Sequence, residues 1–235
     1  MCGRFLIKTT WQELFNEYEL DKEILLPQGE MICAPRGKIL VIRFDNIHSK
    51  RVIEYLIWGA TIKQAYGVTF NIRSESIGIS PTWKEAFLKN RCLIPATAFI
   101  EWQKLEGKTK KEAWKIFQSK QVLYSLAGIY MPFKNIKTNE IEICAFILTT
   151  SANPKMQMIH NSGTNHHRQP VIIKKENYTS WLDPTNQDLI LINSLMHKFE
   201  ESEFEYDLLE QVTNEIVVKN KKVKNKKISE QLNLF

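Results

Sequence analysis

The chain lacks any apolar run long enough to span a membrane, and its N-terminus lacks the basic-then-apolar pattern of a signal peptide. A transmembrane helix needs about 20 consecutive apolar residues, and a secretory signal needs both parts of that pattern. We therefore expect a cytoplasmic protein with no membrane partner. Its 235 residues are enough to bury a sizeable core without disulfides or a structural metal.

Cysteine is scarce, and no two cysteines form a CxxC pair. The four are Cys2, Cys33, Cys92 and Cys144. This spacing argues against zinc ribbons and thioredoxin-type motifs, and we expect neither a metal nor an organic cofactor. Three of them lie in the apolar stretches "MICAP", "RCLIP" and "EICAF", where a free cysteine is typically a small core residue. Cys2 differs from these by its place in the chain.

The positive charge is concentrated near the C-terminus. The formal net charge is +6, and "KNKKVKNKK" at 219–227 holds six lysines and no acid, so the rest of the chain sums to about zero. Such a run is typical of a solvated tail and is compatible with nucleic-acid binding. We expect one domain over residues 1–215 and a lysine-rich segment over 216–235.

Hydrophobic periodicity predicts many strands and a few short helices. Thr10 and Glu13 form a capping box at the start of a helix over 9–20, and Ser80 is the expected cap of a second helix with Pro81 at its first position. A third helix is expected over 186–199. The predicted strands are 39–44, 52–60, 91–95, 98–102, 113–117, 122–130 and 141–150, with a strand leading into a helix over 171–182. This order indicates a single α+β domain with a mostly antiparallel sheet.

Removal of Met1 from "MCGRF" would leave Cys2 with a free α-amine next to its thiol. Both groups ionise close to neutral pH, with reference pKa values of about 8 and 8.5. An aldehyde would form an imine with the amine, and the thiol would then close a stable five-membered thiazolidine ring. The position therefore makes Cys2 a candidate nucleophile.

Two further stretches hold candidate partners for this nucleophile. In "NIRSE", Asn71, Arg73 and Glu75 alternate, so a strand would direct all three to one face. The alternative is an ordinary solvated strand face. Glu101 lies between an apolar run and Trp102, where partial desolvation would raise its pKa toward acid–base use; the alternative is an exposed strand end.

Three of the five histidines lie in "MIHNSGTNHHRQP". Histidine titrates near neutral pH and suits proton transfer. His160 follows an apolar stretch and His166 lies in a Gly-containing loop. We favour His160 as the catalytic histidine because its position should be fixed more firmly.

Taken together, the sequence resembles the SRAP family, named as SOS-response-associated peptidases and described as abasic-site processing proteins. The matching segments occur in the family's order within the first 175 residues: "MCGRF", "APRGK", "WGA", "NIRSE", "RCLIPATAFIEW", "LAGIY", "ILTTSAN" and "MIHN…HRQP". The resemblance implies a curved, barrel-like sheet with peripheral short helices.

The resemblance also implies a DNA damage response function. Cys2 would cross-link to the aldehyde of an abasic site in single-stranded DNA, with possible lyase and autoproteolytic activity. The implied catalytic residues are Cys2, Asn71, Glu101 and His160, and the implied DNA contacts are Arg4, Pro35, Trp58, Arg73 and Arg168. We expect a monomer that associates with the nucleoid when it is bound to DNA.

The sequence departs from the family pattern at a few positions. Ile32 stands where Asn is usual, Ile72 where Ala is common, and Gln169 replaces a Met. Two other functions remain open. One is an N-terminal-nucleophile amidohydrolase such as a glutamine amidotransferase, whose chains also begin Met-Cys-Gly. The other is a non-catalytic nucleic-acid-binding module.

The chain finishes with "QLNLF", Gln231 to Phe235. It looks like the short peptide by which bacterial DNA-processing proteins bind the replication sliding clamp, with apolar anchors on a polar tail and a glutamine that can both donate and accept. The alternative is that these residues dock on the domain itself.

Overall fold

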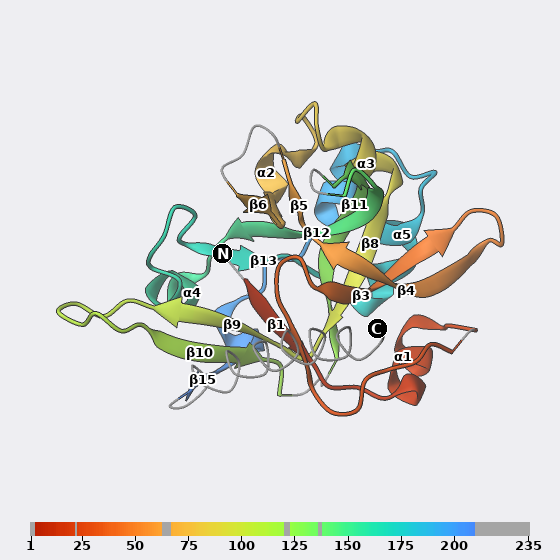
Figure 1. The fold of residues 1–235 in the computed structure, drawn as a ribbon. Coiled ribbons are helices and arrows are strands. Elements are labelled where there is room, and N and C mark those ends of the chain that lie inside the picture. Colours follow the sequence, from red (N-terminus) through yellow and green to blue (C-terminus); the bar gives the residue numbers. More distant parts are fainter. Residues whose placement is uncertain (1–2, 22, 63–66, 120–122, 136–137, 210–235) are drawn as a thin grey trace, which may run out of the picture.

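A closed barrel of five strands forms the centre of this computed structural model, which describes residues 3–21, 23–62, 67–119, 123–135 and 138–209. The barrel strands are β3 (Lys38–Asp45), β4 (Lys50–Trp58), β8 (Arg91–Ala96), β11 (Tyr124–Lys134) and β12 (Ile141–Ser151). The order around the ring is β12, β4, β3, β8 and β11, and pairing of β11 with β12 closes it (Figure 1).

Short strands extend the barrel beside β11 and β12. Two of them, β7 (Asn71–Arg73) and β13 (Arg168–Pro170), pair with β12, and β14 (Ile172–Ile173) pairs with β11. A separate pair is formed by β5 (Ala60–Thr61) and β6 (Val68–Thr69). The β12–β4 and β12–β7 pairings are parallel, whereas the other strand pairings of the described residues are antiparallel.

A second, five-stranded sheet packs beside the barrel. Its order is β15 (Glu205–Leu209), β10 (Glu112–Phe117), β9 (Ala98–Gln103), β1 (Arg4–Ile7) and β2 (Met31–Cys33). One face of this sheet shares the main hydrophobic core with the barrel. The other face carries a small separate apolar cluster that includes Leu6, Ala98, Ile100 and Ala113. The prediction of an α+β fold with a mostly antiparallel, barrel-like sheet is confirmed.

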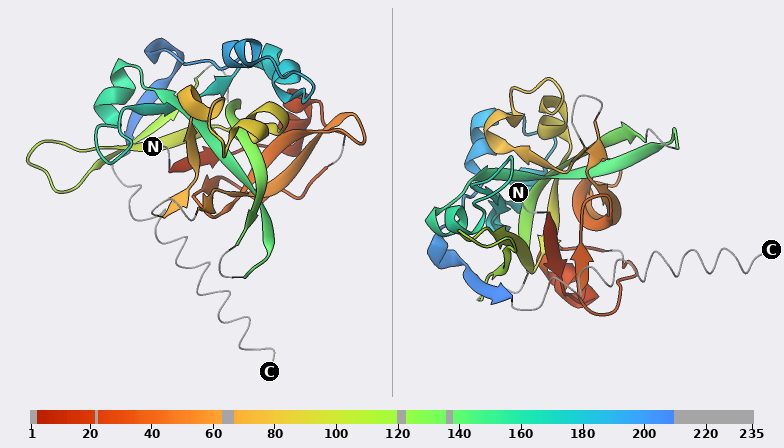
Figure 2. Two further views of the ribbon diagram at one scale, coloured as in Figure 1. Left: turned by 90° about the horizontal axis from the view of Figure 1, so that it is seen from above. Right: turned by 60° about the vertical axis from the view of Figure 1, so that its left-hand side comes forward.

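Short helices lie around the sheets (Figure 2). They are α1 (Trp11–Tyr18), α2 (Ser74–Ile77), α3 (Lys84–Lys89), α4 (Pro154–Ile159), α5 (Tyr178–Leu182) and α6 (Leu189–Ser194), with 3-10 turns at Lys175–Asn177 and Glu201–Glu203. None of the helices in the described ranges is long and apolar enough to cross a membrane.

The predicted helix starts are right at α1 and wrong at α3. The capping box of Thr10 and Glu13 is present, with both hydrogen bonds formed. Ser80 does not cap α3, which begins at Lys84 with Trp83 as its N-cap. The Ser80 carbonyl accepts hydrogen bonds from the backbone N–H groups of Trp83 and Lys84, so a turn precedes the helix.

Candidate active site on β9, β7 and β13

Glu101 is a buried carboxyl group on β9. Its residue is 3% exposed, and it stands opposite Trp114 in the β9–β10 ladder. Burial disfavours the charged form, and it raises the pKa of Glu101 from the usual 4.5 to about 7. The neighbouring strand β1 places Arg4 opposite Ile100. The sequence prediction of a desolvated carboxyl is confirmed, and the exposed alternative is wrong.

Strands β7 and β13 lie along β12 and bring together segments far apart in the sequence. Asn71 is opposite Ile147, Arg73 is opposite Thr149, and Arg168 is opposite Ser151. Asn71 is buried, whereas Arg73 is exposed and donates a hydrogen bond to Asn165 at 3.1 Å.

Glu75 does not share the strand face of Asn71, as the alternation had predicted. The strand ends at Arg73, and Ser74 begins helix α2. Within that helix Glu75 reaches Arg168, whose two terminal guanidinium nitrogens lie 2.7 and 2.6 Å from the two carboxylate oxygens. Partial burial alone would raise the pKa of Glu75, but the hydrogen bonds and charge of Arg168 outweigh it and lower that pKa.

The Arg168 side chain is only 10% exposed and also donates to the carbonyl oxygen of Thr149 at 2.5 Å. Its guanidinium group therefore holds β13 to α2 and β12. A DNA phosphate would have to share this group with Glu75.

His160 follows α4 and is buried at 3% exposure. Asn153 caps this helix by accepting from the backbone N–H of Met156, and Pro154 occupies the first turn, where its missing N–H costs nothing. The Nδ1 atom of His160 lies 3.1 Å from the carbonyl oxygen and 3.3 Å from the backbone nitrogen of Arg168, which fixes the ring orientation in either tautomer. Burial lowers the pKa of His160 to about 4.

The loop after His160 is tied to the end of β9. The Asn161 side chain accepts from the backbone N–H of Lys104 and donates to its carbonyl oxygen, both at 2.9 Å. Lys104 lies three residues beyond Glu101. Strand pairing and hydrogen bonds thus link β7, β13, the turn after α4 and β9, so Asn71, Glu101, His160 and Arg168 belong to one connected region.

His166 differs from His160 in its surroundings. It is exposed, and its Nδ1 atom lies 2.9 Å from the carbonyl oxygen of Gly163 in the same loop. The expectation that His160 is the more firmly positioned of the two is confirmed. Which of them acts in catalysis stays a prediction.

The family resemblance implied a DNA contact for Trp58, but this side chain is buried. Its ring is 0% exposed, and Nε1 donates to the carbonyl oxygen of Phe70 at 2.9 Å. Phe5 and Phe70 pack edge-on against the ring, with centroids at 5.2 and 5.5 Å. Trp58 therefore supports the start of β1 and the segment leading into β7.

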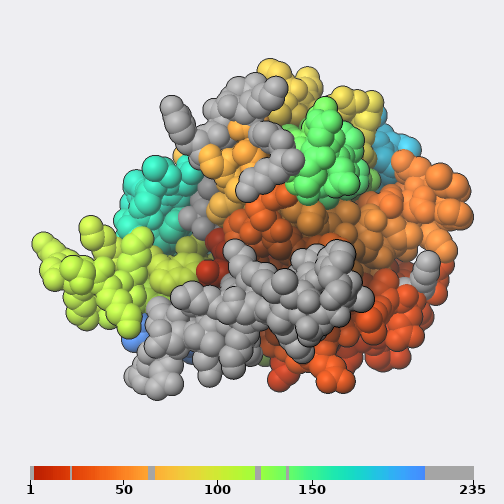
Figure 3. Space-filling model, viewed as in Figure 1, coloured from red at the N-terminus to blue at the C-terminus, as the bar shows by residue number. Residues whose placement is uncertain are grey.

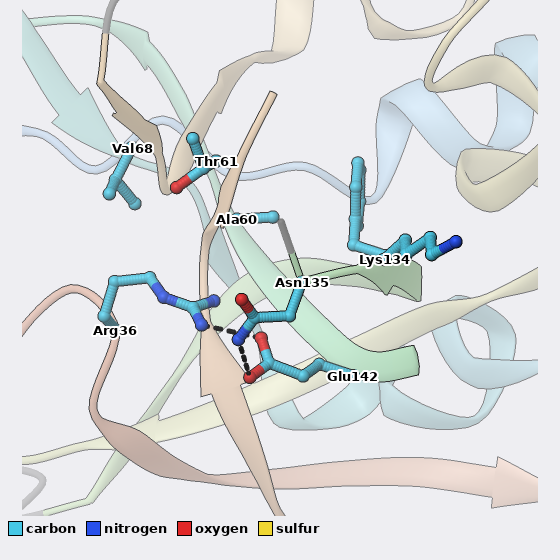
Figure 4. Close-up of a pocket in the computed structure, with 8 residues that line it drawn as sticks. Arg36, Ala60, Thr61, Val68, Lys134, Asn135 and Glu142 are labelled. Carbon is cyan, nitrogen blue, oxygen red and sulfur yellow. Dashed lines mark hydrogen bonds and ion pairs between the residues drawn. The ribbon is translucent and has the colours of Figure 1, made fainter. Parts of the chain in front are cut away.

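The half-buried Pro35 begins a turn in which Arg36 adopts a φ of 68°. The Arg36 backbone N–H donates to Trp58, and its side chain reaches Glu142 at 2.6 Å, which lowers the pKa of that carboxyl. A cavity of about 440 Å³ lies here (Figure 4). Its lining residues are Arg36, Ala60, Thr61, Val68, Phe133, Lys134, Asn135 and Glu142. Asn71, Glu101, His160 and Arg168 are not among the residues that line this cavity.

Cys2 lies outside the described residues, and so does the Gln231–Phe235 peptide. The other three cysteines are buried, as predicted, and burial raises the pKa of each thiol, to about 12 for Cys33. These three thiols are protonated at neutral pH and are poor nucleophiles. Within the described ranges, no group of three or more His, Cys, Asp or Glu side chains could hold a metal ion.

Thr149 and Asn161 were not among the candidates from the sequence, and Glu75 was expected on the strand face of Asn71 instead of beside Arg168. Their partners are far away in sequence, 93 residues in the case of Glu75 and Arg168. Locally, "NIRSE" shows an arginine and a glutamate and "HRQP" shows an arginine. Neither segment indicates that Glu75 would pair with Arg168.

The chain is similar to known proteins over most of its length. It is 30% identical over 214 residues to the abasic site processing protein YoqW of Bacillus subtilis (strain 168), covering 87% of this chain and 90% of that protein. It is 28% identical to YobE of the same organism, another abasic site processing protein, covering 87% and 92%.

Solved structures share the fold. A protein from Bacteroides thetaiotaomicron has a TM-score of 0.73 at 21% identity, covering 89% of this chain and 93% of that chain. A protein from Bordetella bronchiseptica has a TM-score of 0.70 at 19% identity, covering 89% and 100%.

The family model that matches is that of the SOS response associated peptidases, over residues 1–216. Because that match covers most of the chain, the protein belongs to the SOS response associated peptidase (SRAP) family.

Proposed function

We propose that this protein processes abasic sites in single-stranded DNA by forming a covalent thiazolidine cross-link through Cys2. The observation that carries the proposal is Glu101, a buried carboxyl with a pKa of about 7 on the strand next to β1. Cys2 is two residues from Arg4, so covalent geometry keeps its Cα within about 8 Å of the Arg4 Cα. The names of the relatives YoqW and YobE support the same substrate.

The chemistry begins once hydrolysis of the Met1–Cys2 peptide bond has freed the α-amine. The amine attacks the aldehyde carbon of the ring-opened abasic sugar and gives a carbinolamine. Loss of water from the carbinolamine gives an imine. The thiol sulfur then adds to the imine carbon, the thiol proton ends on the nitrogen, and a thiazolidine results. The sum is amine plus thiol plus aldehyde giving thiazolidine plus one water.

Glu101 would supply and recover the protons of these steps. With a pKa of about 7 it is partly protonated at neutral pH, so it can protonate the departing hydroxyl and then accept a proton. His160, neutral because its pKa is about 4, would accept a proton when the sugar ring opens. Asn71 would orient the sugar through its amide.

The DNA strand would follow the positive side chains of this region. Arg4 and the exposed Arg73 would hold phosphates, with Pro35 near the bases. Arg168 would serve mainly to position His160, because its guanidinium group is bound by Glu75. Strand cleavage from the imine would compete with ring closure.

The test is incubation with single-stranded DNA that carries one abasic site, followed by denaturing electrophoresis and intact mass measurement. We expect the mature protein to lack Met1 and to form an adduct that survives denaturation. Cys2→Ala should abolish the adduct, and Cys2→Ser should leave a reducible imine at most. The matched controls Cys33→Ala, Cys92→Ala and Cys144→Ala should retain it.

A stable adduct with Cys2→Ala, or with protein that still carries Met1, would refute the mechanism. Release of ammonia from glutamine without any adduct would support the amidohydrolase alternative instead. Salt-sensitive binding alone would support a non-catalytic module.

A further inference from the structure

The loop between β9 and β10 carries four lysines in eight residues. They are Lys104, Lys108, Lys110 and Lys111, all exposed, with Glu106 as the sole acid of this stretch. Lys108 lies 3.2 Å from Glu112 at the start of β10. This loop, residues 104–111, is named here the lysine hairpin. It keeps a net positive charge after this ion pair is counted.

The lysine hairpin starts at the candidate active site and leads away from it. Its first residue, Lys104, is held by Asn161 and directly follows the end of β9, three residues beyond Glu101. Figure 1 shows the hairpin projecting past α4 and β13, and in Figure 3 it forms a yellow-green lobe on the molecular surface. At about 3.4 Å per residue of extended strand, its lysines lie roughly 10–20 Å from Glu101.

Three of the lysines surround a concavity of about 300 Å³. Lys108, Lys110 and Lys111 line it together with Glu112, and its apolar lining comes from Ala113, Leu208 and Leu209. On the face of Ala113 this floor includes the half-buried Leu209, whereas Leu208, which is 46% exposed, is opposite Trp114 and belongs to the other face of the sheet. An apolar floor with a lysine rim suits a nucleotide, because a base can cover the floor while its phosphate meets an ammonium group.

The concavity is continuous with the sheet face that carries Arg4. Residues directly opposite each other in an antiparallel ladder point to the same face. Arg4 is opposite Ile100, and Ala113 is opposite both Trp102 and Leu209. Ile100 and Trp102 are two residues apart on β9 and therefore point to the same face. That face carries Arg4, Ile100, Trp102, Ala113 and Leu209. Trp102 is half-buried and lies between Arg4 and the concavity.

We propose that the lysine hairpin is a subsite for the single strand that flanks the reacting nucleotide. This rests on the proposed function for the identity of the DNA. The occupant is single-stranded DNA because lysines, a half-buried tryptophan and an apolar floor follow one another away from the site, which is the arrangement that tracks a backbone and stacks bases. The 10–20 Å span corresponds to about three to six phosphates of a stacked strand.

The first test measures salt dependence of binding to undamaged single-stranded DNA. In Lys108→Ala/Lys110→Ala/Lys111→Ala, the slope of log K against log salt should fall by about 2, because each lost phosphate contact contributes about 0.7. The control is Lys84→Ala/Lys89→Ala/Lys174→Ala, which removes the same charge from exposed positions elsewhere. Lys89 is matched to Lys108, since it too has an ion pair of 3.2 Å, with Glu85.

The second test varies the flanks of the abasic site, from one nucleotide to about eight on either side. The triple variant should need about tenfold more DNA for half-maximal adduct formation, with the rate at saturation unchanged. This effect should disappear when the flank on one particular side is cut to one nucleotide.

An unchanged salt slope, or an equal loss in both triple variants, would overturn the subsite. So would a tenfold effect that persists whichever flank is cut. Failure of the wild-type protein to form an adduct would refute the proposed function alone, because the salt-slope measurement on undamaged DNA would still decide the subsite.

Discussion

Glu101 and His160 are both buried, and burial moves their pKa values in opposite directions. The pKa of the acid rises to about 7 and that of the histidine falls to about 4. At neutral pH the histidine is therefore neutral and the carboxyl is partly protonated. Two groups whose environments separate their protonation states in this way are suited to distinct acid and base roles.

The raised pKa of Glu101 predicts a pH dependence of stability. In the unfolded chain this carboxyl ionises near pH 4.5, whereas in the folded protein it keeps its proton up to about pH 7. Unfolding releases a proton between these values, so the wild-type protein should lose stability relative to Glu101→Gln as pH rises through this window, by about 3 kcal/mol in all. Above pH 7 the difference should be constant. Urea unfolding of both proteins across this range measures it, and a pH-independent difference would contradict the assignment.

The histidines give a second prediction at this scale. His160→Ala should slow adduct formation by about 10²-fold, the usual scale for a general acid or base. His166→Ala is the matched control and should react normally, because its ring is exposed and bonded within its own loop. Rapid-quench rates on a saturating abasic-site oligonucleotide distinguish them. The reverse order of the two rates would transfer the role to His166.

At the scale of elements, β12 is the strand on which the region around the candidate site is assembled. It pairs in parallel with β7 and antiparallel with β13. The sequence predicted β12 itself from its apolar and β-branched residues. The alternation in "NIRSE" suggested a strand over 71–75, whereas β7 covers only Asn71–Arg73. The sequence did not predict that Glu75 would leave the strand, since the Arg168 that attracts it is remote in sequence.

Gly59 sets the path of the chain into this region. Its φ is +80°, and a Cβ at this position would stand 2.5 Å from the carbonyl oxygen of Thr69 and 2.6 Å from the Cβ of Phe70. Gly59→Ala should therefore displace the segment before Asn71 and slow adduct formation. We also expect a loss of unfolding free energy about 1–3 kcal/mol larger than that of the control.

The control for that prediction is Gly29→Ala. Gly29 has a nearly identical φ of +81° but no atom within 4 Å of an added Cβ. The Gly29→Ala variant therefore introduces the same backbone strain as Gly59→Ala but no steric clash. Equal destabilisation of the two variants, measured by urea unfolding, would show that strain alone acts at Gly59.

For the whole molecule, composition and pattern predicted the fold class, the three buried thiols and the family. These depend on local periodicity and on an ordered set of short motifs. The parallel pairing of β12 with the remote strand β4, which the closed barrel needs, and the burial of Trp58 were not predicted. Both depend on which strands meet in space, and "WGA" alone does not distinguish a tryptophan that packs in the core from one that stacks on a base.

The Gln231–Phe235 peptide carries the prediction that belongs to the whole chain. Binding of purified sliding clamp should be lost on truncation after Glu230, because Leu232, Leu234 and Phe235 are the expected apolar anchors. Leu232→Ala/Phe235→Ala should match the truncation, and Lys224→Ala/Lys226→Ala, which keeps the anchors, should bind nearly as well as the full chain. Equal clamp affinity of the full and truncated chains, or none for either, would refute this recruitment and leave the cross-linking proposal unaffected.

The pairing of β13 with β12 also has a consequence in time. The nucleophile is at residue 2, but the strand that fixes His160 ends at Pro170. At about 5–20 residues per second, the ribosome makes that strand roughly 10–30 s after the N-terminus. Self-catalysed removal of Met1 would have to wait for it, whereas a housekeeping aminopeptidase would not. If the completed site performs the cleavage, nascent chains arrested before Arg168 should retain Met1, and loss of Met1 from such chains would assign the cleavage to an aminopeptidase.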